Sequence, residues 1–166
     1  MIYDRFVQGL NTIPLLSPQD TAATALTTPY MQLGGSHGGT LFVHFGTVTG
    51  VSDDEPVTVT LLAATVAGGS GAAAVTFNYR LSSAVGANAW GAVTAATTAG
   101  VALTSVSVDG KVLAIDISPS GILSQKADAT HFAAAVTPNA ALTVCNVSAI
   151  LQLVPRYSQN DMVSAT

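Results

Sequence analysis

Hydrophobic and polar residues alternate along most of the chain from about Thr28 onward. Such alternation is typical of β-strands that bury one face and expose the other. It is clearest in residues 40–48, 56–66, 74–82, 101–108, 111–118 and 131–137. A longer segment, 141–154, shifts its alternation near Asn146, as a β-bulge would cause. The pattern predicts about eight antiparallel strands.

The alternation also predicts which side chains form the core. The expected core-facing positions are Leu41, Val43, Phe45, Val57, Val59, Leu61, Val75, Phe77, Tyr79, Leu81, Leu113, Ile115, Ile117, Phe132, Ala134 and Val136. The intervening residues, among them His44 and Asp116, are expected on the opposite, more polar side. This arrangement is typical of sheets with one buried face.

Turn-forming residues separate the predicted strands. The Asp109-Gly110 dipeptide lies between 101–108 and 111–118, and we expect a two-residue hairpin turn there, because such turns require positive φ angles. A polar connection at 119–129 has room for one helical turn. The sequence therefore predicts an all-β fold, an antiparallel two-sheet sandwich of jelly-roll type.

The Ala-rich stretch 84–99 does not continue the alternation. Ala favours a helix, but Gly and Thr residues within the stretch oppose one. We expect a loop there, with a weak strand around Trp90.

The first 20 residues do not show the alternation of hydrophobic and polar positions seen in the rest of the chain. Pro14 and Pro18 interrupt a weakly helical spacing, so we expect an extended N-terminal arm over 1–20, followed by a sandwich domain over 21–157 and a tail over 158–166. The arm is too apolar to stay in water and must be buried on its own domain or on a partner. The candidate interface residues are Ile2, Tyr3, Phe6, Val7, Leu10, Ile13, Leu15 and Leu16.

Composition limits the classes of function. The chain of 166 residues is 49% hydrophobic and 8% charged, with a formal net charge of -4, which disfavours disorder. Its five basic residues are scattered, so no nucleic-acid-binding patch is expected. No apolar run approaches the ~20 residues of a membrane helix, and we expect neither a membrane span nor a secretory signal. So few charges suggest a surface largely covered by other subunits.

The residues that carry chemistry show no catalytic or metal-binding pattern. His37, His44 and His131 lack the spacing of zinc ligands, and no nucleophile-elbow sequence accompanies them. Cys145 lies in an apolar run and is expected to be a buried thiol. The acidic tip 53–55 reads as a solvated turn, since it lacks the ligand spacing of a calcium loop. We expect no enzyme activity, no metal and no cofactor.

Several stretches together resemble a known family. They are Gly46 to Gly50, Val57 to Leu61, Tyr79 to Ser83 leading to Ala89-Trp90, Val112 to Ile117, and the closing strand Val147 to Arg156. Over about residues 28–157 the chain resembles the small jelly-roll decoration, or cement, proteins of tailed-bacteriophage heads. The resemblance implies a non-enzymatic homotrimer on the capsid exterior of the virion that binds the major capsid protein and stabilises contacts between its subunits. The arm would then lie against a neighbouring subunit or the capsid.

A binding module is the main alternative. A ligand- or carbohydrate-binding jelly roll of a phage fibre or tail would fit the same strand pattern. An aromatic cleft would favour it, although the aromatic residues of this chain are dispersed in the sequence. A hydrolase is a third reading, supported only by the presence of serines and histidines.

Overall fold

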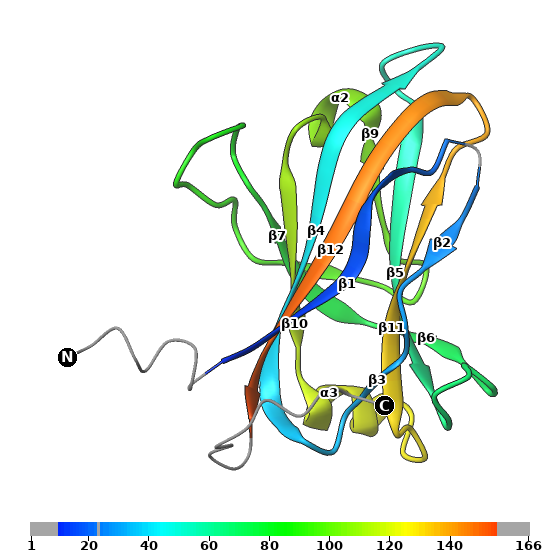
Figure 1. Ribbon diagram of the computed structural model, residues 1–166, viewed down its shortest axis with the longest axis vertical. Coiled ribbons are helices and arrows are strands. Elements are labelled where there is room, and N and C mark those ends of the chain that lie inside the picture. Colours follow the sequence, from blue (N-terminus) through cyan, green and yellow to red (C-terminus); the bar gives the residue numbers. More distant parts are fainter. Residues whose placement is uncertain (1–9, 23, 156–166) are drawn as a thin grey trace.

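The computed structural model describes residues 10–22 and 24–155. Strands account for 59% of the described residues and helices for 8%. Two antiparallel sheets pack face to face with the core between them (Figure 1). The predicted fold class, an all-β antiparallel sandwich, is confirmed.

The first sheet, which we call sheet A, is built around two long neighbouring strands. Its strand order is β1 (Asn11–Asp20), β12 (Leu142–Pro155), β4 (Ser36–Gly50), β10 (Val112–Ile117), β7 (Phe77–Leu81) and β8 (Thr94–Ala96). The register between β12 and β4 shifts between Cys145 and Val147. This shift confirms the irregularity predicted near Asn146.

The second sheet, sheet B, has shorter strands. Its main path is β2 (Leu26–Thr27), β11 (His131–Pro138), β5 (Pro56–Ala64) and β6 (Ala73–Val75), while β3 (Met31–Gln32) pairs with β11 and β9 (Val101–Thr104) pairs with β5. Two short helices, α2 (Ser105–Val108) and α3 (Pro119–Gln125), complete the described elements. Helix α3 confirms the helical turn expected in 119–129.

The inner faces of the two sheets form one hydrophobic core. Phe45 of β4, Ile115 of β10, Leu61 of β5 and Phe132 of β11 are at most 1% exposed. The predicted core positions are buried, apart from Tyr79 and Leu81, which are half-buried at the edge of the core. Alternation thus assigned the inward faces of these strands correctly. Burying each such side chain contributes ~1.5–3 kcal/mol, which favours the apolar face of each strand turning toward the core.

Segment 74–82 is two strands rather than one. Strand β6 belongs to sheet B and β7 to sheet A, and the chain changes sheets at Thr76. The Gln125 side chain holds this crossing, because its Oε1 accepts hydrogen bonds from the N–H and the hydroxyl of Thr76 at 2.6 and 2.9 Å. A contact with α3 therefore satisfies the backbone where the strand ladder breaks.

The hairpin predicted at Asp109-Gly110 is wrong. Strand β9 pairs with β5 in sheet B, β10 pairs with β4 and β7 in sheet A, and residues 105–108 form helix α2. Gly110 does have a positive φ of 66°. The dipeptide turns the chain from a helix into a strand of the other sheet. Asp109 has φ -49° and ψ 120°, so the pair has the angles of a type II turn, whereas the two-residue hairpin expected for Asp-Gly needs a positive φ at both residues.

The boundary expected at residue 20 is also not a boundary of the fold. Strand β1 pairs with β12 and buries Leu15, while Ile13 and Leu16 pack partly against the core. The register shifts between Pro14 and Leu16 and again beyond Leu16, which accommodates proline on an edge strand. Residues 11–20 therefore form an edge strand of the sandwich rather than an arm outside it.

Beyond β1, the chain crosses to the other sheet. Strands β2 and β3 pair with β11, so residues 11–32 cover the side of the sandwich where β12 and β11 would otherwise be edges (Figure 1). Four of the predicted interface residues, Ile2, Tyr3, Phe6 and Val7, lie outside the described residues, as does the tail 158–166.

Candidate binding surface

The outer face of sheet A carries a band of apolar side chains. The register places Pro14 beside Ile150, Ile150 beside Phe42, Phe42 beside Ala114, and Ala114 beside Arg80. Side chains at directly opposed positions on one face are neighbours. The band therefore crosses β1, β12, β4 and β10 and ends at a charged residue on β7.

A long loop, residues 83–93, rises beside this band. Its base is held by hydrogen bonds from the N–H of Gly91 to the Leu81 carbonyl at 2.8 Å and from the N–H of Ser83 to the Ala89 carbonyl at 3.0 Å. Trp90 forms an isolated bridge with Ser82, and its ring lies 6.3 Å from that of Phe42 in a tilted arrangement. The loop thus places the tryptophan on the sheet face, in a geometry that aromatic pairs favour.

The loop and the sheet enclose a groove of about 550 Å³. We call it the aromatic groove; its main lining residues are Phe42, His44, Val85, Trp90, Val112 and Ile150. Three of its apolar residues remain substantially exposed, Trp90 at 42%, Ile150 at 44% and Val85 at 70%. This cluster of exposed apolar residues makes the groove the candidate contact surface of the described chain.

Gly110 closes one end of the aromatic groove. A Cβ added to it would lie 2.6 Å from Cγ2 of Val85, so the loop tip packs directly on the glycine backbone. The N–H of Gly110 donates to the Gly46 carbonyl at 3.0 Å, and the N–H of Val48 donates to the Asp109 carboxylate at 2.9 Å. The Asp109-Gly110 turn is therefore anchored to β4 and supports the loop.

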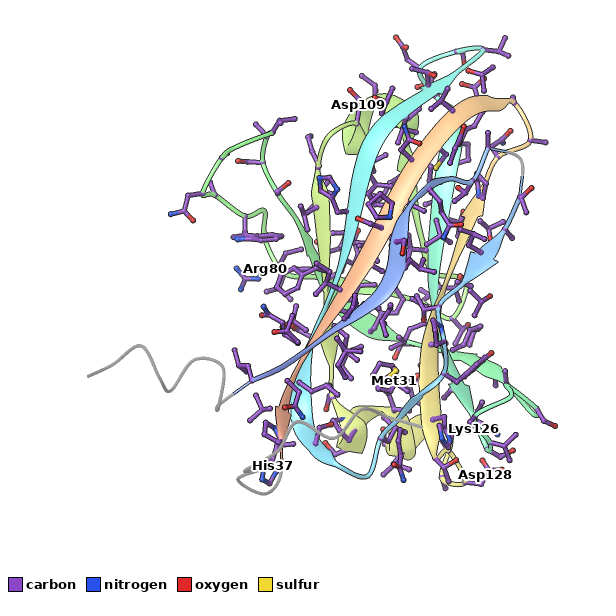
Figure 2. All side chains as sticks on the ribbon, viewed as in Figure 1. Met31, His37, Arg80, Asp109, Lys126 and Asp128 are labelled. Atoms are coloured by element: carbon purple, nitrogen blue, oxygen red, sulfur yellow. The ribbon has the colours of Figure 1, made fainter. Side chains whose placement is uncertain are left out.

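Charged side chains lie mostly at the two ends of the sandwich. The acidic tip and Asp109 are at one end, and the ion pair between Lys126 and Asp128, 2.9 Å long, is at the other (Figure 2). Within the described ranges, the outer face of sheet A carries Arg80 and Asp116 near its middle and Asp20 at the end of β1. The outward positions of β5 and β11 in sheet B hold Thr, Ala, Leu and one His. Neither broad face requires the desolvation of many charges to become buried.

The histidines do not come together. His44 borders the aromatic groove, His37 is exposed near the start of β4, and His131 lies on β11 with its Nδ1 2.7 Å from the Thr130 hydroxyl. In the part of the chain that the structure describes, no three His, Cys, Asp or Glu side chains are grouped as a metal site requires. Both carboxylate oxygens of Glu55 accept from the N–H of Ser52 at 2.9 Å, so the acidic tip closes on its own backbone.

Cys145 is fully buried on β12, as its sequence context predicted. Desolvation raises the pKa of the thiol, although a hydrogen bond with Thr21 acts in the opposite direction. The N–H of Cys145 donates to Asp20 at 2.9 Å, and this bond together with one from Ala22 lowers the pKa of that carboxyl. Burial and a raised pKa both make the thiol a poor nucleophile.

The sequence analysis missed the aromatic groove. It placed His44 on the outward side of β4, which is correct, but it expected that side to be polar. The available signal was that Phe42, Val112 and Ile150 occupy outward positions of strands whose inward positions are already apolar. Large apolar residues at single outward positions, between polar ones such as His44 and Ser148, indicate a local apolar surface on that face.

Comparison of the chain with protein-family models, with curated proteins and with solved structures finds no match. Among the residues that the structure describes, no helix combines the length and the hydropathy needed to span a membrane.

Proposed function

We propose that the chain is a structural protein of a bacteriophage particle, which binds the outer surface of the capsid as a homotrimer and stabilises contacts between major capsid subunits. The observation that carries this proposal is the apolar outer face of sheet A with its aromatic groove. The resemblance to phage decoration proteins supplies the capsid as the partner. The paucity of charge supports a surface buried in an assembly.

The energetics of such a face suit a stable contact. Trp90 and Phe42 form an aromatic pair, and Ile150 extends it along the sheet. Burying aromatic anchors in a pocket supplies most of the affinity of typical interfaces. At ~25 cal/mol per Å² of apolar surface, the exposed parts of these side chains would stabilise a contact without new ion pairs.

Residues 1–9, which we call the leading segment, are proposed as a second attachment element. Leu15 is buried in its own sandwich, and Ile13 and Leu16 are partly buried there, so these three offer less apolar surface to a partner than the sequence suggested. Ile2, Tyr3, Phe6 and Val7 precede the first described residue, Leu10, and remain the candidates from the original set. Leu10 itself is half-buried immediately before β1.

The proposal is tested by binding to particles. Purified particles should contain the chain by mass spectrometry, and particles prepared without it should take up the recombinant protein and resist heat better. Trp90→Ala and Ile150→Thr should weaken uptake, whereas Val51→Thr, at an exposed site in the acidic-tip loop, should not. Absence of the chain from particles, together with no uptake, would refute the proposed function.

The aromatic groove also supports carbohydrate binding as a second candidate function. A tryptophan beside a phenylalanine offers a face on which sugar rings stack, and His44 and Ser148 at the rim could form hydrogen bonds to hydroxyl groups. A glycan array followed by calorimetry distinguishes the two functions. Saturable sugar binding that Trp90→Ala abolishes would favour the binding module, and no binding to any glycan would leave capsid attachment as the better account.

A further inference from the structure

We infer that the leading segment of one copy docks in the aromatic groove of a neighbouring copy. This inference rests on the proposed self-association, and it names the two surfaces that would meet. The groove is apolar and open in the single chain, with Trp90 42% and Ile150 44% exposed. The leading segment contains the apolar residues Ile2, Tyr3, Phe6 and Val7, and the aromatic groove is an apolar surface that could receive such side chains.

The chemistry of the two surfaces matches. The leading segment reads Ile2-Tyr3, then Asp4-Arg5, then Phe6-Val7, an acid and a base between two apolar pairs. The outer face of sheet A offers an apolar band and, outside the lining of the groove, the opposite charges Arg80 and Asp116 on adjacent strands β7 and β10. Within residues 10–22 and 24–155 neither of these two residues forms an ion pair. Docking would give Asp4 and Arg5 opposite charges while burying the flanking apolar pairs.

The place where the described chain begins favours a neighbouring copy. Asn11 pairs with Leu153, and β1 then runs toward Asn146, so the residues before Asn11 enter from the end of the sheet beyond Leu153. The groove lies in the opposite direction along β12, at Ile150 and Ser148. The straight continuation of β1 therefore leads away from the chain's own groove. Nine residues span up to about 30 Å when extended, which is enough to reach across an adjacent subunit.

Such an exchange has a consequence for symmetry. A segment of one copy that fits a different surface of the next copy forms a heterologous contact, and a heterologous contact closes into a ring when the rotation permits. In a closed trimer each leading segment docks in a neighbour's groove, and no groove is left empty. The inference therefore gives the proposed trimer a specific interface.

Directed disulfide formation tests the contact in the full-length protein. One tagged chain carries Phe6→Cys, a differently tagged and co-expressed chain carries Val85→Cys, and non-reducing electrophoresis after mild oxidation measures the mixed dimer. The native Cys145 is fully buried and does not compete. The matched control replaces Val85→Cys by Val66→Cys, an exposed valine in the turn after β5 that does not line the groove. We expect several-fold more mixed dimer with Val85→Cys than with Val66→Cys.

The outcomes separate the interface from the proposed function. Equal cross-linking of Phe6→Cys to Val85→Cys and to Val66→Cys would overturn the inference. An internal disulfide in a single chain that carries both Phe6→Cys and Val85→Cys would also overturn it, because it would place the segment in the groove of its own chain. Sedimentation of the unmodified protein reports the oligomer separately. A trimer that binds particles but gives no selective cross-link refutes only the groove assignment, whereas a monomer that does not bind particles refutes the proposed function.

Trp90 provides an independent optical readout, because it is the only tryptophan of the chain. Docking of Phe6 and Tyr3 beside it should lower its access to solvent. In the full-length chain, Phe6→Ser and Tyr3→Ser should shift its emission to the red and increase quenching by acrylamide, while Gln8→Ser should change neither. Unchanged emission and quenching in all three variants would contradict the docking.

Discussion

Leu15→Ala tests whether β1 belongs to the sandwich or to an interface. Leu15 is 7% exposed and packs in the core beneath the pairing of β1 with β12. Replacing a buried Leu by Ala costs about 2–5 kcal/mol in other proteins, and the lower part of that range applies because an edge strand can relax into the space. We therefore expect the free energy of unfolding to fall by about 2–3 kcal/mol.

The assay is urea unfolding followed by circular dichroism at two protein concentrations. Leu16→Ala is the matched control on the same strand, since Leu16 is only partly buried and should cost about half as much. If residues 11–20 were instead an arm held by a partner, Leu15→Ala would change the dependence on protein concentration and leave the unfolding of dilute protein unaltered. An effect below about 0.5 kcal/mol in dilute protein would refute the assignment of β1 to the core.

Four further predictions follow from named contacts. Gly110→Ala should lower the free energy of unfolding by about 1–2 kcal/mol, because Gly110 has a positive φ. Adding Val85→Ala should recover only the share of this loss that comes from the clash between the new Cβ and Val85. Denaturation of the single and double variants measures both effects. Two backbone N–H groups hold the pKa of Asp20 below its usual value, so the stabilisation that the carboxylate supplies should be complete at neutral pH and lost as the pH falls through and below the ordinary aspartate range. Asp20→Asn should reduce this loss of stability in acid-unfolding curves. Identical curves for the two proteins would contradict the assignment. The Cys145 thiol should react with a thiol reagent only after unfolding, so rapid labelling of native protein would contradict its burial. Trp90→Ala should change the free energy of unfolding by less than about 1.5 kcal/mol, because the ring is 42% exposed, and a larger loss in urea unfolding would make Trp90 a core residue.

Sequence alternation predicted the core well where a strand stays within one sheet. Leu113, Ile115 and Ile117 alternate with half-buried or exposed neighbours and are buried as expected. The method depends on side-chain direction, which has a period of two in any strand. It contains no information on which strand is the neighbour.

That limit explains the errors. The turn at Gly110 needs a positive φ whether it joins two paired strands or, as observed, a helix to a strand of the other sheet. The two prolines of β1 suggested an arm, because nothing local shows that β12 offers an edge on which they are tolerated. Both outcomes are decided by contacts between residues far apart in the sequence.

The candidate site was predictable only in part. Phe42 and Ile150 occupy outward positions, and their hydrophobicity could have indicated a second covered face. Their convergence with Trp90 depends on the path of the 83–93 loop, which hydrogen bonds to β7 determine. No spacing in the sequence encodes that path.

The proposed function requires the outer face of sheet A for attachment to the capsid, with its groove holding the trimer together and the rest of the face free for the capsid. Co-sedimentation with capsids prepared without the chain measures this most directly, comparing the wild-type protein with Ile150→Thr and with the loop control Val51→Thr. We expect the wild-type and Val51→Thr proteins to sediment with the capsids to the same extent, while Ile150→Thr, still folded by circular dichroism, binds at least about tenfold more weakly. Equal binding by all three proteins would contradict the claim.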